Sequence, residues 1–343
     1  MSRTDDILDK TKRKDSEAKK WKVVAGIVVG LVLAGGLFCG LYYTTLPITT
    51  SHFSTHFELI KLYDFYDKKI GDEEAAVYFV GSSHMATSIY TPFMDEELNN
   101  RGYDFVTYSV FNPSNTPIML AMQTERIIES KPSLIIYGVS LASLTWGLTN
   151  EEQTLIAVSQ GRFDKTLELL SLYPETYQYL FDENPFYARG YLVRSFMPHS
   201  MSDFTNTHEY IKESYGIERR LELDKGKSLE NILAEIPDGG VHLIENPTVE
   251  NQLNALNYTL QKFMDANIPT VLISMPQHPL LSDAISEDDR LYVHNRYDGI
   301  GVKWFDFEKK YGDEHFVDTA HASWSGCQEF SHDMVNLVIQ ELS

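Results

Sequence analysis

Two short polar segments, far apart in the sequence, contain a serine, an aspartate and a histidine. The first reads GSSH at residues 81–84 and directly follows an apolar run. The second reads DTAH at residues 318–321. A histidine can remove the proton of a serine hydroxyl, and a carboxylate three residues before that histidine can orient its imidazole. These residue types and spacings therefore favour nucleophilic attack by a serine on an acyl carbonyl.

Each segment alone also has a simpler interpretation. A serine-rich turn after a strand is a common cap for the helix that follows. An aspartate three residues before a histidine is compatible with a helix N-cap followed by a surface histidine. The chemical interpretation therefore depends on whether the fold brings residues 81–84 and 318–321 together.

Five apolar runs predict strands that are covered on both faces, because they are rich in β-branched and aromatic residues and do not alternate with polar ones. They lie at residues 76–81, 105–110, 134–139, 270–275 and 302–305. Helical patterns separate them, at residues 92–101, 117–131, 249–266, 282–295 and 325–342. This alternation predicts an α/β fold with three layers, in which helices cover both faces of a five-stranded parallel sheet. The expected strand order is 2-1-3-4-5, as in flavodoxin-like sheets.

The predicted sheet places both polar segments at the edge formed by the carboxyl ends of the strands, where open α/β sheets bind ligands. His84, beside the serines, and His278, after the fourth strand, are candidates for lining a pocket at this edge. A helical insertion at 144–238 follows the third strand, and we expect it to form a lid or side lobe there.

Taken together, the two segments resemble the SGNH (GDSL-type) hydrolase superfamily. The resemblance implies that Ser83 is the nucleophile and that Asp318 and His321 complete a catalytic triad. It also implies an oxyanion hole formed by groups of Ser114, Asn115 and Ser140, although the family usually has glycine and Gly-x-Asn in these two blocks. Family members need no cofactor, and we expect none here.

The N-terminal region indicates a membrane anchor. Residues 23–43 form an uncharged apolar segment that is long enough to cross a bilayer as a helix. This segment follows a basic tail at residues 1–22. The lysines before the span predict a cytoplasmic N-terminus and an extracellular C-terminal domain. A cleaved signal peptide is the alternative, but no clear cleavage site follows the apolar run.

Charge narrows the choice of partners. The whole chain carries −20 and the tail about +3, so the rest carries −23, which argues against nucleic acid. The eleven histidines include a single pair with HxxxH spacing, His52 and His56, and none with HxH spacing, and we predict no metal site.

The sequence thus predicts four parts: a tail at 1–22, a span at 23–43, a connector at 44–75 and an SGNH-like domain at 76–343. With its anchor, the chain resembles branches of the superfamily such as the teichoic-acid D-alanylation proteins and cell-surface O-acyltransferases and esterases. The resemblance implies a plasma-membrane esterase or O-acyltransferase that acts on an acylated surface polymer or a small acyl ester. A membrane acyl-transfer protein is a further partner that it implies. The alternative is a non-catalytic binding or scaffold subunit of a cell-envelope assembly.

Overall fold

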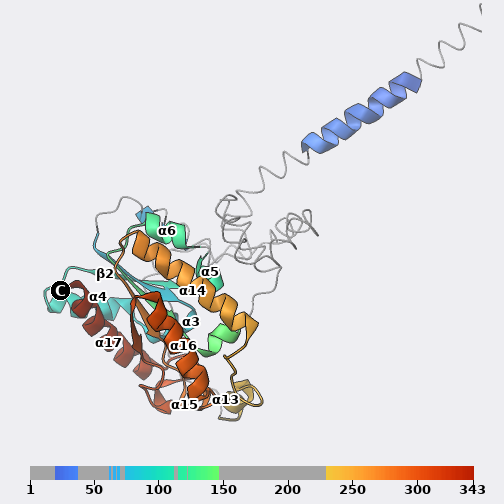
Figure 1. Ribbon diagram of the computed structural model, residues 1–343. Coiled ribbons are helices and arrows are strands. Elements are labelled where there is room, and N and C mark those ends of the chain that lie inside the picture. Colours follow the sequence, from blue (N-terminus) through green and yellow to red (C-terminus); the bar gives the residue numbers. More distant parts are fainter. Residues whose placement is uncertain are drawn as a thin grey trace, which may run out of the picture.

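The computed structural model describes residues 20–37, 62, 65, 66, 68, 69, 74–111, 115–121, 123–146 and 229–343 (Figure 1). Most of the expected insertion, residues 147–228, lies outside the described residues, as do residues 1–19 of the basic tail. The prediction that this insertion forms a lid therefore stays a prediction.

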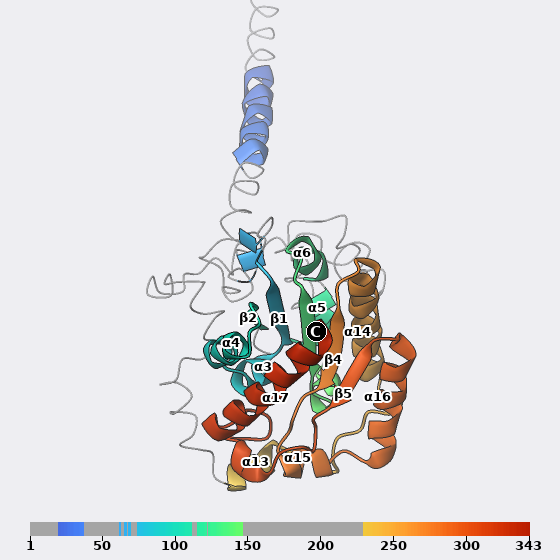
Figure 2. The same cartoon turned by 90° about the vertical axis from the view of Figure 1, so that its left-hand side faces the viewer.

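A five-stranded sheet forms the centre of the domain, and all of its strand pairs are parallel (Figure 2). The strand order is β2-β1-β3-β4-β5, as predicted. The strands are β1 (Ala76–Gly81), β2 (Val106–Phe111), β3 (Leu134–Val139), β4 (Thr270–Ser274) and β5 (Lys303–Asp306). Since β1 lies between β2 and β3, its carboxyl end lies inside the sheet, one strand away from the edge strand β2.

Helices connect the strands. They are α3 (Ser83–Ser88), α4 (Thr91–Asn100), α5 (Pro117–Ala121), α6 (Thr124–Glu129), α13 (Leu229–Glu235), α14 (Pro247–Asp265), α15 (Pro279–Asp283), α16 (Glu287–Ile300) and α17 (Trp324–Leu342). Two 3-10 turns, η1 (Ala142–Thr145) and η4 (Asp313–His315), follow β3 and β5.

Two expected helices are each divided into two. The pattern at 117–131 forms α5 and α6, and the pattern at 282–295 forms the end of α15 and most of α16. The second division has a local cause. Ser286 caps α16 by accepting a hydrogen bond from the backbone N–H of Asp289, at 3.1 Å, so a new helix begins there.

Alternating strand residues face two separate hydrophobic cores. In β1, Tyr78 and Val80 belong to the core that α14 and α16 cover, whereas Val77 and Phe79 belong to the core that α4 and α17 cover. Figure 1 shows these two pairs of helices on opposite sides of the sheet. All six residues of β1 are buried, which explains the continuous apolar run in the sequence.

The two edge strands differ from each other. β2 is nearly fully buried, and the backbone N–H of Thr107 donates to Asp95 Oδ1 of α4 at 2.7 Å. β5 has only four residues, begins with Lys303 and ends with Asp306, and none of its residues is buried. The expectation that this last strand is buried is therefore wrong: charged residues stand at both ends, and Trp304 and Phe305 are only partly buried against the two cores.

An apolar helix, Lys20–Leu37, has a mean hydropathy of 1.7, and none of it is buried against the domain. By length and composition this helix is able to cross a membrane, and a signal sequence near an N-terminus would have the same properties. The last part of the predicted span, residues 38–43, lies outside the described residues. In the segment expected to be a connector, Leu62, Phe65 and Tyr66 are buried in the core beside α5 and α6.

Candidate active site

The structure brings the two polar segments together. Ser83 Oγ lies 2.9 Å from His321 Nε2, although the two residues are 238 positions apart. His321 Nδ1 lies 2.8 Å from Asp318 Oδ2 and 3.0 Å from Asp318 Oδ1. An ionised carboxylate only accepts hydrogen bonds, so Nδ1 carries the imidazole proton and Nε2 accepts the Ser83 hydroxyl. This is the hydrogen-bond order of a nucleophile, a general base and an orienting carboxylate.

The end of β1 fixes the position of Ser83. Ser82 caps α3 by accepting a hydrogen bond from the backbone N–H of His84, at 3.3 Å, and Ser83 is the first residue of that helix. A Cβ on Gly81 would lie only 2.9 Å from Met85 Cβ and 3.1 Å from the carbonyl oxygen of Gly138. Only glycine allows this close approach, so the chain can turn from strand to helix with Ser83 at the sheet edge.

A closed loop fixes the position of His321. The backbone N–H of Val317 donates to the carbonyl oxygen of His321 at 2.9 Å. Inside this loop, Asp318 Oδ1 accepts hydrogen bonds from the backbone N–H groups of Ala320, at 2.9 Å, and His321, at 2.8 Å. The aspartate therefore orients the histidine through the backbone as well as through the ring.

The same contacts keep Asp318 ionised. Burial alone would raise the pKa of its carboxyl group. The hydrogen bond and charge of His321, together with the two backbone N–H groups, outweigh burial and hold the pKa well below its usual range. Asp318 is thus a permanent anion beside the imidazole at neutral pH.

Contacts with two neighbouring elements hold the loop against the sheet edge. The backbone N–H of His278 donates to the carbonyl oxygen of Thr319 at 3.0 Å. The backbone N–H of Ala322 donates to Thr87 Oγ1 of α3 at 3.3 Å. The loop that carries Asp318 and His321 is therefore bonded both to the segment after β4 and to α3, the helix that begins with Ser83.

A cavity of about 280 Å³ opens beside the triad. Its lining includes His84, Trp146, Glu235, Leu281, Asp318 and His321. A cavity of this size holds a small group, and it has both apolar and acidic walls.

His84 lies in the wall of this cavity, as its position beside Ser83 suggested. Its ring meets those of His321 and Trp146 edge to face, with centroids 5.4 Å and 5.9 Å away. Burial, with a smaller contribution from the charge of His321, lowers the pKa of His84 to about 3. The residue is therefore a neutral imidazole at physiological pH.

Two of the residues expected to contribute to the oxyanion hole, Asn115 and Ser140, have side chains that are hydrogen-bonded within the protein. Asn115 Nδ2 donates to the carbonyl oxygen of Gly81 at 3.1 Å, and Ser140 Oγ donates to Gln277 Oε1 at 2.9 Å. Each of these side chains thus donates a hydrogen bond to an acceptor within the protein, and neither lines the cavity. Ser114 lies outside the described residues.

The other histidine considered for the pocket, His278, caps a helix. Its Nδ1 accepts a hydrogen bond from the backbone N–H of Leu280 at 3.2 Å, so it caps α15. Burial lowers its pKa, and its ring packs against Phe316 with centroids 5.9 Å apart. Within the described residues it does not line the cavity beside Ser83.

Sequence reasoning missed three residues of this site. Trp146 and Glu235 line the cavity from η1 and α13, on either side of the segment at 147–228. Glu235 Oε2 accepts a hydrogen bond from Thr319 Oγ1 at 3.1 Å, next to Asp318. Thr87 joins α3 to the histidine loop. None of the three belongs to a motif, so no local pattern could have identified them.

Comparison of the sequence with protein-family models gives no match, and comparison with curated proteins gives none either. The chemical assignment of the site therefore rests on its own residues and their geometry.

Proposed function

We propose that the protein is a membrane-tethered extracellular serine esterase or O-acyltransferase of the SGNH type. The observation that supports this most directly is the pair of short contacts on His321, 2.9 Å from Nε2 to Ser83 Oγ and 2.8 Å from Nδ1 to Asp318 Oδ2. A buried, ionised Asp318 that fixes the histidine tautomer has a clear role in catalysis and none in a simple helix cap.

In the first half of the reaction, Ser83 Oγ attacks the acyl carbonyl while its proton moves to His321 Nε2. The backbone N–H of Ser83, in the first turn of α3, is our candidate donor to the oxyanion. The tetrahedral intermediate then expels the alcohol, which takes the proton from His321. The acyl group remains on Ser83 as an ester.

In the second half, water or an acceptor hydroxyl gives its proton to His321 Nε2 and attacks the acyl-serine. Collapse of the second tetrahedral intermediate releases the acid or the new ester, and the proton returns to Ser83 Oγ. Asp318 stays ionised and stabilises the transient imidazolium in both halves. The cavity of about 280 Å³ beside His321 is our candidate site for the acyl group.

The apolar helix Lys20–Leu37 and the basic residues before it support a tether with the domain outside the cell. A tethered esterase would meet acyl groups on polymers of the same surface, and a membrane acyl-transfer protein would be a natural donor. Small acyl esters are the corresponding soluble substrates.

A non-catalytic binding subunit is the second candidate, and a specific observation favours it. The hydroxyl of Ser140 donates to Gln277 within the protein, so it does not supply the oxyanion donor that was expected of it. Loss of one such donor typically reduces the rate by about 10²–10³. In this second candidate function, the cavity is a binding site and Ser83 takes part in no reaction.

Labelling of the full-length protein with a fluorophosphonate probe separates the two candidates. We expect wild type to react and Ser83→Ala to be unreactive, with little change in melting temperature because Ser83 is a partly exposed cleft residue. The matched control is Ser82→Ala, which removes the neighbouring hydroxyl and the cap of α3. It should lose about 1 kcal/mol of stability but keep most of the labelling. A wild-type protein that never reacts, although folded, would favour the binding subunit.

A further inference from the structure

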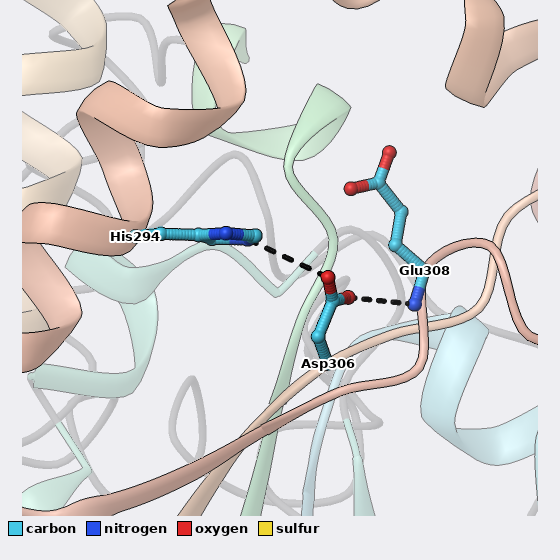
Figure 3. Close-up of side chains that lie close together, drawn as sticks. All are labelled: His294, Asp306 and Glu308. Carbon is cyan, nitrogen blue, oxygen red and sulfur yellow. Dashed lines mark hydrogen bonds and ion pairs between the residues drawn. The ribbon is translucent and has the colours of Figure 1, made fainter. Parts of the chain in front are cut away.

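Three side chains with metal-binding atoms come together at the last strand of the sheet (Figure 3). His294 comes from α16, Asp306 is the last residue of β5, and Glu308 lies in the loop beyond it. One ligand atom from each lies within 4.8 Å of the other two. The spacing of histidines in the sequence did not indicate this group, because its members come from a helix, a strand and a loop.

Two potential ligand atoms of these side chains are buried and have no hydrogen-bond partner. They are His294 Nε2 and Glu308 Oε1. The side chain of Glu308 is 0% exposed. Asp306 Oδ2 lies 3.9 Å from His294 Nε2, which is too far for a hydrogen bond. Buried polar atoms without partners are destabilising, and a cation between these side chains would bond to both atoms.

The protein holds the other oxygen of each carboxylate. Asp306 Oδ1 accepts a hydrogen bond from the backbone N–H of Glu308 at 2.9 Å. Glu308 Oε2 is paired with the guanidinium of Arg290, which also donates to the carbonyl oxygen of Ser282 at 2.8 Å. Carboxylates that bind metal through one oxygen are commonly oriented through the other in this way. Each acidic side chain is thus prepared to offer a single oxygen.

We propose that His294, Asp306 and Glu308 bind one zinc ion, with water as the fourth ligand. A neutral imidazole with two carboxylates suits zinc, whereas calcium and magnesium prefer oxygen ligands alone. Two carboxylates beside one guanidinium leave a net charge of −1, which favours a divalent cation.

Zinc bonds of about 2.0–2.2 Å place tetrahedral ligand atoms about 3.3 Å apart. The three atoms must therefore draw together on binding. The Asp306 side chain is 41% exposed and has room to make this movement.

The ion would strengthen the fold and would take no part in the reaction at Ser83. It would tie α16 to β5 and to the loop after it. The carbonyl oxygen of Glu308 accepts a hydrogen bond from the backbone N–H of Gln277, at 3.2 Å, so this loop also contacts the segment after β4. None of the three ligands lines the cavity beside the triad.

The test uses the full-length protein in detergent, without a histidine tag, after removal of metals by a chelator. We expect it to take up one zinc ion per chain and to melt several degrees higher when zinc is in excess. Cobalt in place of zinc should give the intense visible absorption of a four-coordinate site. Asp306→Asn and His294→Gln should each weaken zinc binding by at least about tenfold and remove the thermal shift.

The control is His332→Gln, which removes an exposed histidine that pairs with Glu97 at 3.0 Å elsewhere on the surface. It should bind zinc as wild type does. The melting temperatures of all variants are first compared without metal, which identifies any loss of folding. Failure to bind zinc at micromolar concentration, or binding that survives both ligand substitutions, would overturn the proposal.

Discussion

The backbone N–H of Ala322 donates a hydrogen bond to Thr87 Oγ1 at 3.3 Å. This bond joins the loop of His321 to the helix of Ser83, because the Thr87 hydroxyl also donates to the carbonyl oxygen of Ser83 at 3.1 Å. Thr87 thus helps to set the distance between Ser83 and His321, although it makes no hydrogen bond to the side chain of either residue.

Removing this hydroxyl should therefore slow the reaction. Thr87→Val keeps the shape of the side chain, which is 2% exposed, but cannot accept the bond from Ala322. We expect the second-order rate of probe labelling to fall by about tenfold or more, since small displacements of catalytic groups are costly. Thr87→Ser retains the hydroxyl and should restore most of the rate. Equal labelling rates for the two variants would remove Thr87 from the positioning role.

Asp318→Asn should be more damaging. Its amide would favour the imidazole tautomer with the proton on Nε2, which cannot accept the Ser83 proton, and comparable changes reduce rates by about 10⁴. The loss would be measured as the rate of fluorophosphonate labelling at pH 7, in samples quenched at a series of times. Labelling within tenfold of wild type would contradict the triad.

Asp318 also contributes to stability in a defined pH range. Its pKa in the folded protein lies below the ordinary value of 3.8, so its stabilising contribution is complete above about pH 4. That contribution is lost as the pH falls through the folded pKa, because the unfolded chain binds the proton first. Urea unfolding of wild type and Asp318→Asn should therefore differ at pH 7 and converge in strong acid.

His84 should make the domain sensitive to mild acid. Its pKa of about 3 in the folded protein is below the ordinary 6.5, so the unfolded chain gains a proton that the folded one does not. Stability should fall from about pH 6.5 downwards, by up to roughly 4 kcal/mol from this residue. Chemical unfolding of His84→Phe, measured across this pH range, should therefore show a shallower pH dependence than wild type. Identical slopes for wild type and His84→Phe would show that His84 gains its proton without unfolding.

The proposed orientation can be tested on cells. If Lys20–Leu37 spans the membrane with a cytoplasmic N-terminus, protease added to intact cells should remove the domain at 76–343 and spare an N-terminal tag. Carbonate washing should leave the full-length chain in the membrane. Release of the domain into the medium with a new N-terminus after the apolar run would instead identify a cleaved signal sequence.

The sequence predicted the sheet well where burial dominates. The bounds of β1 and β3 match the predicted runs at 76–81 and 134–139, because strands covered on both faces leave long apolar runs. It was wrong for β5, whose aromatic residues resemble a buried strand although the strand lies at the edge. It also missed the break before α16, since one capping serine, Ser286, divides an otherwise continuous helical pattern.

For the site, the order of strands was enough to bring Ser83 and His321 to one edge. The side-chain donors were beyond such reasoning, because the direction in which Asn115 or Ser140 points depends on distant partners such as Gln277. Trp146 and Glu235 also line the cavity, but their positions there depend on the course of the whole chain and not on a local sequence pattern.

The two edges of the sheet affect how copies of the protein behave beside one another. An edge strand with unpaired backbone groups can accept a strand from another molecule and start aggregation. On β2 the N–H of Thr107 is already bonded to Asp95, and β5 is short and has Lys303 and Asp306 at its ends. A crowded layer of such domains, tethered in one plane, would therefore have little tendency to join sheet to sheet.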